Sequence, residues 1–408
     1  MPQPDDSPLN RAIHEAIAAQ EEAGLLRRRR EIRPVDAVRI QIEGRDLVNF
    51  ASNDYLGLCR HRAVIDAIKG AAESAGAGAG ASPLITGYTQ QHAAAEREIA
   101  AWKRTESAIL LPSGYQAAHA AVQTLARLAE TGQKGRRQGG VRFLVDKLAH
   151  ASLIDAVLAT QLPVRVFPHN HMGKLSRLLA EGPPQQMQVV VTESIFSMDG
   201  DAADLEGIAA LKRRHGLVLL LDEAHGSGVY GSGGSGYASH RGLERIVDVC
   251  IVTLSKAMGL AGGAICASTA FCDAVANFGR AYIYSTAVMP AVAAGAVAAI
   301  GVMRDEPHRQ ARLRELSQGV RAELARQGRP LPPGDSPIIA IILGHERAAI
   351  EAARAMEDRG MLVAAVRPPT VARGTSRLRV TLSCEHTDEQ VGKLLDCLAA
   401  VTPASGRS

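Results

Sequence analysis

Residues 216–225 read GLVLLLDEAH, in which a run of five apolar side chains, Leu217 to Leu221, ends at Asp222. A strand with one face in water alternates apolar and polar residues, so a continuous apolar run indicates a strand that is covered on both faces. An aspartate directly after such a run is costly to bury without a partner. This stretch therefore predicts a buried strand whose C-terminal end carries a functional carboxylate.

Four further runs have the same character: VRFLVD (141–146), QVVVTES (188–194), DVCIVTLSK (248–256) and GGAICAS (262–268). Helix-length segments such as residues 205–215 separate them, which predicts a mostly parallel sheet in an α/β domain. Ligands of such sheets bind beyond the carboxyl ends of the strands. We therefore expect the strand ends to converge on one pocket, with the side chains of Glu193, Asp222, His225 and Lys256.

The segments on either side of this sheet predict a second, smaller unit. Apolar spacing predicts a helix over residues 8–30 with an arginine-rich end, and RIQI and LVNF around residues 43–46 predict a hairpin. Beyond residue 300 we expect a long helix, a strand at 337–343, a helix at 346–359, strands at 362–366 and 376–382, and a final helix. The expected domains are an N-terminal helix and hairpin (1–50), a large α/β domain (51–300) and a small α+β domain (301–408).

The composition excludes several classes of protein. The 408 residues carry a net charge of only +4 with both signs interspersed, which gives a nucleic-acid or membrane-surface role no global support. The apolar run 287–303 contains Pro290 and many small residues, so we expect a buried helix there. Residues 1–10 lack a signal-peptide pattern, and the cysteines form no CxxC pair, so we expect a reducing, cytoplasmic setting. The six cysteines are Cys59, Cys250, Cys266, Cys272, Cys384 and Cys397.

Lys256 is the first candidate catalytic residue. A lysine after a buried strand loses hydration, which lowers its pKa and provides a neutral amine for a Schiff base, although a surface lysine at a strand end is the commoner case. Asp222 would keep a pyridine ring cationic, and His225 would donate to its phenolic oxygen. LLLDEAH also matches the magnesium-binding strand of helicases, but the GxxxxGK[ST] phosphate loop that such an ATPase needs is absent from the sequence.

Two further segments carry candidate cofactor contacts. His150 follows another predicted strand and is placed to stack on a cofactor ring, with a structural role as the alternative. Gly114 and Tyr115 begin a helix after LLPS, where backbone N–H groups can approach a phosphate, unless this is an ordinary helix start. The Gly/Ala stretch 76–88 is either a flexible linker or an ordered loop lining the site.

Other polar residues left two interpretations open. His169 and His171 resemble half of a metal site, but no ligand cluster accompanies them and a polar loop is favoured. In RPPTVARGTSRLRVTL (367–382), alternation places Arg377, Arg379 and Thr381 on one face of a strand. An arginine binds a carboxylate through two parallel hydrogen bonds, whereas a solvated strand face would explain the same pattern.

Taken in order, nine segments of the chain resemble the α-oxoamine synthases, a branch of the fold-type-I pyridoxal-phosphate (PLP) enzymes. The resemblance runs from about Leu25 to the last helix. It is carried by SNDYLGL, ITGYTQQH, LPSGYQAAH, HASLIDA, TESIFSMDGDAADL, DEAHGSGVYG, TLSKAMG, YIYSTAVMPA and RPPTVARGTSRLRVTL. The resemblance implies a large domain with a mostly parallel sheet, a smaller C-terminal domain, and a homodimer with active sites at its interface.

The resemblance also implies a role for each matching residue. Lys256 holds the cofactor as a Schiff base and later moves the substrate's α proton, while Asp222 faces the pyridine nitrogen. His150 stacks on the ring and His225 contacts its phenolic oxygen. The cofactor-cradling positions are Gly114, Tyr115, Ser197 and Thr253, with Thr286 reaching the phosphate of the neighbouring subunit, and Asn53 and Arg379 lie near the amino-acid carboxylate.

Within this family, RPPTV followed by GTSRLRVTL is most similar to the branch that condenses L-alanine with a pimeloyl thioester, on CoA or acyl carrier protein, to 8-amino-7-oxononanoate in biotin biosynthesis. In that reading Arg27 and Thr370 lie along the acyl chain. Ser255 and Ser82-Pro83 differ from residues common in the family. The alternatives are glycine C-acetyltransferase (2-amino-3-ketobutyrate CoA ligase), another α-oxoamine synthase, or an inert partner subunit, against which Lys256 argues.

Overall fold

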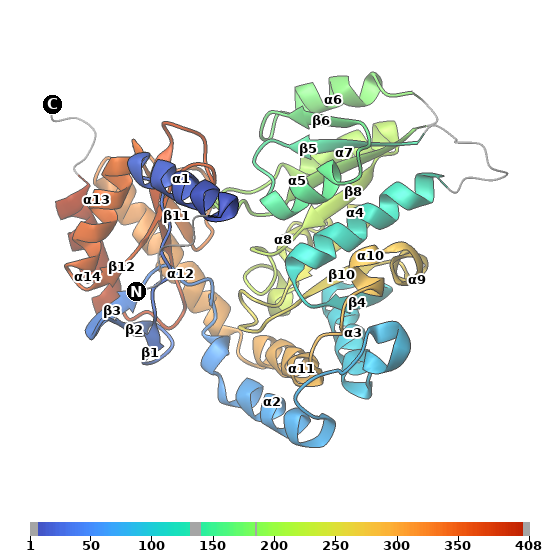
Figure 1. The fold of residues 1–408 in the computed structure, drawn as a ribbon, viewed down its shortest axis with the longest axis horizontal. Coiled ribbons are helices and arrows are strands. Elements are labelled where there is room, and N and C mark those ends of the chain that lie inside the picture. The colour runs from blue at the N-terminus through green and yellow to red at the C-terminus, as the bar shows by residue number, and fades with distance from the viewer. Residues whose placement is uncertain (1–6, 131–139, 184–185, 403–408) are drawn as a thin grey trace.

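The structure is a computed structural model that describes residues 7–130, 140–183 and 186–402. Residues 1–6, part of the start at which no signal peptide is expected, lie outside the described residues. Figure 1 shows two lobes: a large one built on a central sheet, and a smaller one in which the N-terminal strands lie beside the C-terminal elements.

A seven-stranded sheet forms the centre of the large lobe, in the order β4-β10-β9-β8-β7-β5-β6. Strand β10 pairs antiparallel with both of its neighbours, and the pairs among β5 to β9 are parallel, so the predicted mostly parallel sheet is confirmed. Its strands are β4 (Ser107–Leu111), β5 (Val141–Asp146), β6 (Val164–Phe167), β7 (Met187–Glu193), β8 (Val218–Asp222), β9 (Val249–Thr253) and β10 (Gly263–Ala267).

Apolar side chains leave this sheet on both faces, which explains the continuous apolar runs. Val189, Val191 and Leu220 belong to one buried cluster, whereas Val190 and Leu219 belong to another on the opposite face. The helices of this lobe are α2 (Arg62–Ala75), α3 (Gln90–Lys103), α4 (Gly114–Glu130), α5 (Ala151–Leu158), α6 (Met172–Ala180), α7 (Leu205–His215), α8 (Tyr237–His240), α9 (Thr269–Phe278), α10 (Arg280–Ile283) and α11 (Pro290–Asp305).

The apolar run at 287–303 forms α11, whose interior side chains are buried against α2 and α3, as predicted. Among the described residues no helix has the length and apolarity needed to cross a membrane. The Gly/Ala stretch 76–88 is an ordered loop rather than a flexible linker. Its Ala81 carbonyl accepts a hydrogen bond of 3.0 Å from Ala287 N, and a Cβ on Gly87 would lie only 2.2 Å from that same carbonyl oxygen.

The small lobe joins the two ends of the chain. The predicted hairpin is present as β2 (Arg39–Ile42) and β3 (Arg45–Asn49), and it forms one sheet with β1 (Arg33–Pro34) and β12 (Met361–Leu362). A second sheet has the order β11-β14-β13, with β11 (Ile338–Gly344), β13 (Ala364–Val366) and β14 (Ser376–Thr381). The helices are α12 (His308–Arg326), α13 (Glu346–Glu357) and α14 (Asp388–Val401).

Two expectations for this lobe were wrong in detail. The helix expected over residues 8–30 ends early, since α1 spans Pro8–Glu22 and Gly24 adopts a left-handed φ of 66° that ends the helix. The four arginines 27–30 therefore lie in an irregular segment rather than at a helix end. The single strand expected at 362–366 is divided at Val363 between β12 and β13, which belong to different sheets.

Candidate active site

The carboxyl ends of β7, β8 and β9 bring the predicted residues together. Glu193 pairs in register with Asp222, and Asp222 with Ile251, so these strand ends lie side by side. Lys256 follows β9, and its Nζ lies 2.8 Å from Nε2 of His225, which follows β8. The predicted convergence is therefore observed, because parallel strands place their carboxyl ends at one edge.

Burial sets the charge of this cluster. Burial lowers the pKa of Lys256 to about 8, although Asp222 and Glu193 oppose the change. Burial also lowers the pKa of His225 well below its usual value, and the nearby Lys256 adds to this effect. The pKa of Asp222 is raised by burial, against the influence of Lys256. The site thus holds a lysine that readily gives up its proton and a neutral imidazole.

A chain of hydrogen bonds runs from Lys256 across to the small lobe. His225 Nδ1 lies 2.6 Å from the Tyr55 hydroxyl oxygen, and the Tyr55 hydroxyl donates to Asn53 Oδ1 at 3.3 Å. Both terminal nitrogens of Arg379 donate to the same oxygen at 3.2 Å. With His225 neutral, the tautomer that satisfies these contacts carries its proton on Nδ1 and donates it to Tyr55. The chain links the amine to the predicted carboxylate-binding arginine.

The predicted phosphate-binding residues lie around the start of α4. A Cβ on Gly114 would lie 3.2 Å from the Thr253 side chain, so the helix begins directly beside β9. Tyr115 is exposed, and its hydroxyl donates to Asp155 at 2.8 Å. Ser197 is buried in the loop after β7, where its carbonyl oxygen accepts a hydrogen bond of 2.6 Å from Arg379 Nε.

Two predicted cofactor residues stand apart from this hydrogen-bonded chain. His150 caps the N-terminus of α5, where its Nδ1 accepts from Ser152 N at 3.2 Å, and the residue is exposed. Thr286 is exposed in the segment after α10. No hydrogen bond among the described residues joins either of them to Lys256 or Asp222. His150 nevertheless lies within electrostatic reach of the cluster: burial lowers its pKa, and the charges of Asp222 and Lys256 act on it in opposite directions.

The arginines of β14 are buried, so the solvated strand face considered for them was wrong. Arg379 is 6% exposed and Arg377 is 5% exposed. Arg377 pairs with Asp199 and donates to the Met198 carbonyl at 3.3 Å. These arginines point from the small lobe into the 194–204 loop of the large lobe, which covers the strand face.

Arg379 also lines a cavity of about 490 Å³ beside the small lobe. The predicted acyl-chain residues Arg27 and Thr370 line the same cavity, together with Arg367. Arg367 donates to the Leu26 carbonyl at 2.9 Å, which ties the N-terminal segment to the loop before β14. Several positive side chains, Arg27, Arg367 and Arg379, thus line the same space.

The sequence motifs assign no role to three residues of the site. Tyr55 stands in SNDYLGL, but nothing local signals that its hydroxyl meets His225. Arg367 stands in RPPTV, and its position beside Arg27 depends on packing of the two chain ends. Glu193 was expected at a strand end. It is 2% exposed, its Oε1 has no hydrogen-bond partner among the described residues, and burial beside Asp222 raises its pKa well above the usual range.

The cluster fits pyridoxal phosphate, the cofactor that the family resemblance implies. An amine of lowered pKa suits an aldehyde. Asp222 Oδ1 accepts from Ala224 N at 2.8 Å, while Oδ2 accepts no hydrogen bond from the described residues and is available to a protonated ring nitrogen. The N-terminus of α4 with Gly114 suits a phosphate. The residues present therefore meet each chemical requirement of the group.

Comparison with known sequences gives relatives over nearly the whole chain. Residues 45–398 match the family described as aminotransferase class I and II. An 8-amino-7-oxononanoate synthase of Methylobacillus flagellatus is 37% identical over 392 residues, covering 96% of each chain. An enzyme of the same name from Anaeromyxobacter dehalogenans is 40% identical over 388 residues, covering 95% of this chain and 94% of the relative.

Solved structures share the fold at similar coverage. A serine palmitoyltransferase from S. paucimobilis with a bound PLP–myriocin aldimine has a TM-score of 0.88 at 27% identity, covering 97% of this chain and 98% of the other. An 8-amino-7-oxononanoate synthase from Francisella tularensis has a TM-score of 0.72 at 25% identity, covering 87% and 97%. Both similarities extend over the two lobes.

Proposed function

This chain belongs to the aminotransferase class I and II family, and on that premise we propose that it is a PLP-dependent acyltransferase acting on an amino acid and an acyl thioester. The proposed reaction condenses L-alanine with a pimeloyl thioester to 8-amino-7-oxononanoate, a step of biotin biosynthesis, and releases carbon dioxide and the thiol. The observation that carries the proposal is the hydrogen-bonded chain from Lys256 to Arg379, which ends on the cavity that holds Arg27.

Pyridoxal phosphate, when bound, supplies an aldehyde for an amine and a cationic ring that withdraws electrons from the carbon next to that nitrogen. In the proposed enzyme Lys256 Nζ binds the cofactor and, once the substrate has displaced it, takes the α proton. Asp222 keeps the ring nitrogen protonated. His225, oriented by Tyr55, contacts the phenolic oxygen, and His150 stacks on the ring.

The two carboxylates of the substrates have separate partners in this proposal. Arg379, steadied by Asn53 and the Ser197 carbonyl, binds the carboxylate of the amino acid. Arg27 and Arg367 face the far carboxylate of a dicarboxylic acyl chain, and Thr370 lies along that chain. A donor that ends in a methyl group offers these two guanidinium groups no carboxylate, whereas a dicarboxylic donor does, which favours the dicarboxylic donor.

We further propose a homodimer in the cytoplasm, with Thr286 reaching the phosphate of the neighbouring subunit. Large side chains are exposed on both sides of this threonine and in the 82–88 loop. Tyr284 is 73% exposed, Met289 44% and Ile85 76%. Apolar surface of this kind favours burial against another chain. Sedimentation velocity tests the assembly, and a monomer at working concentration would contradict it.

The function is tested with a matrix of acyl donors and amino acids. Pimeloyl and acetyl thioesters, each on CoA and on acyl carrier protein, are combined with alanine, glycine and serine, and thiol release and product mass are recorded. We expect the fastest turnover with alanine and the pimeloyl group. Faster turnover of glycine with acetyl-CoA would identify a glycine C-acetyltransferase instead.

A second candidate follows from the solved structures. The serine palmitoyltransferase has a TM-score of 0.88, higher than the 0.72 of the 8-amino-7-oxononanoate synthase structure. Serine with palmitoyl-CoA is therefore added to the matrix. The arginines of the acyl cavity oppose this pair, because a long apolar chain offers them no acceptor.

A further inference from the structure

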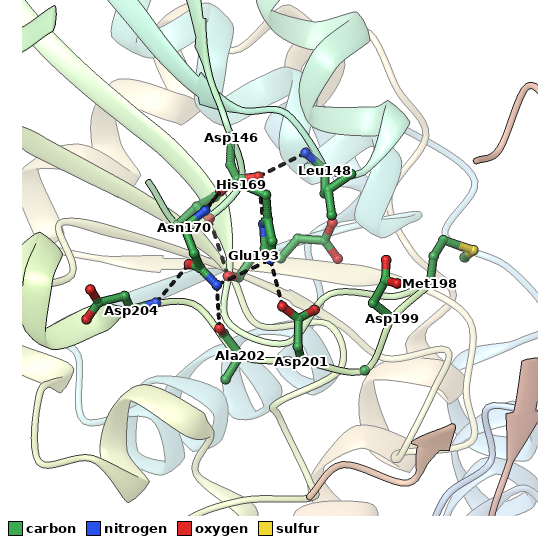
Figure 2. Close-up of polar contacts among 12 residues, drawn as sticks. Asp146, Leu148, His169, Asn170, Glu193, Met198, Asp199, Asp201, Ala202 and Asp204 are labelled. Carbon is green, nitrogen blue, oxygen red and sulfur yellow. Dashed lines mark hydrogen bonds and ion pairs between the residues drawn. The ribbon is translucent and has the colours of Figure 1, made fainter. Parts of the chain in front are cut away.

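His169 is held between two carboxylates outside the cluster described above. It lies in the loop between β6 and α6, and Figure 2 shows its ring directed at Asp146 on one side and Asp201 on the other. The distances are 3.0 Å from Nδ1 to Asp146 Oδ1 and 2.6 Å from Nε2 to Asp201 Oδ2. The prediction of a plain polar loop therefore missed the two carboxylate contacts of His169. Among the described residues, no group of three or more side chains is fit to hold a metal ion.

The geometry determines which protons the ring carries. An ionised carboxylate only accepts hydrogen bonds, whereas a neutral imidazole has a single N–H. Asp146 is 1% exposed and already accepts hydrogen bonds from Leu148 N at 2.9 Å and Asn170 N at 3.2 Å. Contacts with carboxylates at both ring nitrogens thus match a doubly protonated, cationic His169, although the Asn170 amide nitrogen also lies 3.2 Å from Nε2 as a competing donor.

The surroundings of the ring favour the same charge. Phe196 packs against the ring in a T-shaped arrangement with 4.3 Å between centroids, and the Asn170 amide donates to the Ala202 carbonyl at 2.9 Å. Among the described residues neither aspartate forms an ion pair with a lysine or arginine, although Arg321 is influenced by Asp201 at longer range. Burial opposes the charge, but the hydrogen bonds to Asp146 and Asp201 outweigh it and raise the pKa of His169 to about 10.

Asp201 belongs to the loop at 194–204, whose base is closed by backbone hydrogen bonds. Phe196 N donates to the Asp201 carbonyl at 2.9 Å, and Gly200 N to the Phe196 carbonyl at 2.8 Å. The tip between them offers its carbonyl groups to the small lobe: Ser197 to Arg379, Met198 to Arg377, and Gly200 to Ser336 at 2.6 Å. A contact that fixes Asp201 therefore also fixes the Ser197 carbonyl, which accepts a hydrogen bond from Arg379.

We propose that His169 is a positioning residue, whose cationic ring ties the 194–204 loop to the end of β5 and so fixes the Ser197 carbonyl that orients Arg379 toward the amino-acid carboxylate. This inference rests on the proposed function, since it takes Arg379 to be the carboxylate-binding residue. His169 itself touches neither substrate nor cofactor. It acts through Asp201, the closed loop base and Ser197.

The first test measures the ring directly in the intact protein. In the ¹⁵N NMR spectrum of the imidazole groups at pH 8, with the signal assigned by its loss in His169→Gln, we expect both nitrogens of His169 to be protonated. A neutral ring at this pH overturns the proposal. This readout does not depend on the reaction, so it stands apart from failure of the proposed function.

The second test separates positioning from general stability. For His169→Gln we expect faster amide exchange confined to residues 194–204, an unchanged cofactor absorption band, and a KM for the amino acid raised about 10-fold with kcat nearly unchanged, as for one charge-assisted hydrogen bond. His171→Gln, an exposed neighbour in the same loop, should change none of these. Equal losses from both variants, or a loss of kcat with KM unchanged, would overturn the proposal.

A double-mutant cycle completes the test. If His169 acts through Arg379, His169→Gln should raise the amino-acid KM less than twofold in an Arg379→Lys background. Fully additive effects would contradict the coupling. Asp201→Asn serves where His169→Gln fails to fold, because it removes the loop's side of the same contact. If the wild-type protein turned over no amino acid, the proposed function would be refuted. The charge of His169 and the amide exchange of residues 194–204 would still test whether His169 positions the loop.

Discussion

The two sides of the active site are built in different ways. On the large lobe, Asp222, His225 and Lys256 stand at the ends of neighbouring strands of one sheet, so strand register alone brings them together. On the small lobe, Arg379 lies in a separate three-stranded sheet and reaches the site through contacts with Asn53 and the Ser197 carbonyl.

This difference predicts a division of labour. A side that depends on one sheet is rigid as soon as that sheet folds, which suits a cofactor that stays bound through many turnovers. A side that depends on contact between lobes is sensitive to small displacements of either lobe, and such displacements change substrate binding first. Variants on the two sides should therefore affect different measured quantities, in the following order of effect.

Lys256→Ala should have the largest effect. Removing the amine removes the covalent attachment of the cofactor and the base for the α proton, so we expect the visible absorption band of the holoprotein to disappear and turnover to fall about 10⁴-fold. Spectroscopy and thiol release measure the two effects. Lys69→Ala, an exposed lysine of α2, is the control, and an unchanged absorption band together with unchanged turnover in Lys256→Ala would refute the assignment of the large-lobe side.

Asp222→Asn should come next. An amide keeps the contact with Ala224 N but cannot pair with a protonated ring nitrogen, so kcat should fall about 10² to 10³-fold while the protein remains folded. Single-turnover kinetics with the reconstituted protein measure the effect. Asp273→Asn, on the exposed face of α9, should leave kcat unchanged. A variant that changed only KM would contradict the assignment of Asp222 to the cofactor-binding side of the site.

Arg379→Lys should show the opposite pattern. Lysine keeps the charge but cannot make the paired hydrogen bonds of a guanidinium, so the KM for the amino acid should rise about 10 to 50-fold with the cofactor band retained. Initial rates over a range of amino-acid concentration give the split between KM and kcat. Arg373→Lys, exposed in the preceding loop, is the matched control. Loss of the band together with activity would show that the two sides are not independent.

The pH dependence of cofactor attachment tests the large-lobe side of the site alone. Only the neutral amine of Lys256 attacks an aldehyde, so the rate constant for taking up pyridoxal phosphate should rise about 10-fold per pH unit below the pKa and level off above it. With the pKa lowered to about 8, we expect the plateau to begin near pH 8. Stopped-flow absorbance measures this profile. A rise that continues to about pH 10, the range of an ordinary lysine, would contradict the burial argument.

Tyr55→Phe should have the smallest effect, because it removes one hydroxyl from the link between the two sides. His225 would lose the partner of Nδ1, and we expect about a 5-fold loss of kcat/KM with cofactor content unchanged. Steady-state kinetics of matched holoproteins measure it. Tyr282→Phe is the control, since Tyr282 is also buried and its hydroxyl makes no hydrogen bond to the described residues. An effect as large as that of Asp222→Asn would mean that Tyr55 does more than orient His225.

The amino-acid sequence alone determined the large-lobe side. Strands covered on both faces must be apolar throughout, so the first polar residue after each run marks the strand end, and parallel strands place these ends at one edge. In this way the sequence places Asp222 directly after one apolar run, and Glu193 and Lys256 near the ends of two others. The motifs shared with a known family then added His150, Ser197 and the other predicted contacts, whose roles stay predictions.

Only the tertiary structure decided the small-lobe side and the link between the lobes. Tyr55 and His225 are 170 residues apart in sequence, and Asn53 and Arg379 are 326 residues apart. Alternation on β14 predicts that Arg377 and Arg379 share a face, but it does not distinguish a solvent-exposed face from a buried one. In the structure the 194–204 loop covers that face. Local patterns encode which side of an element is buried. The partner that meets a buried polar group is chosen by the packing of distant segments, and that choice leaves no local signal.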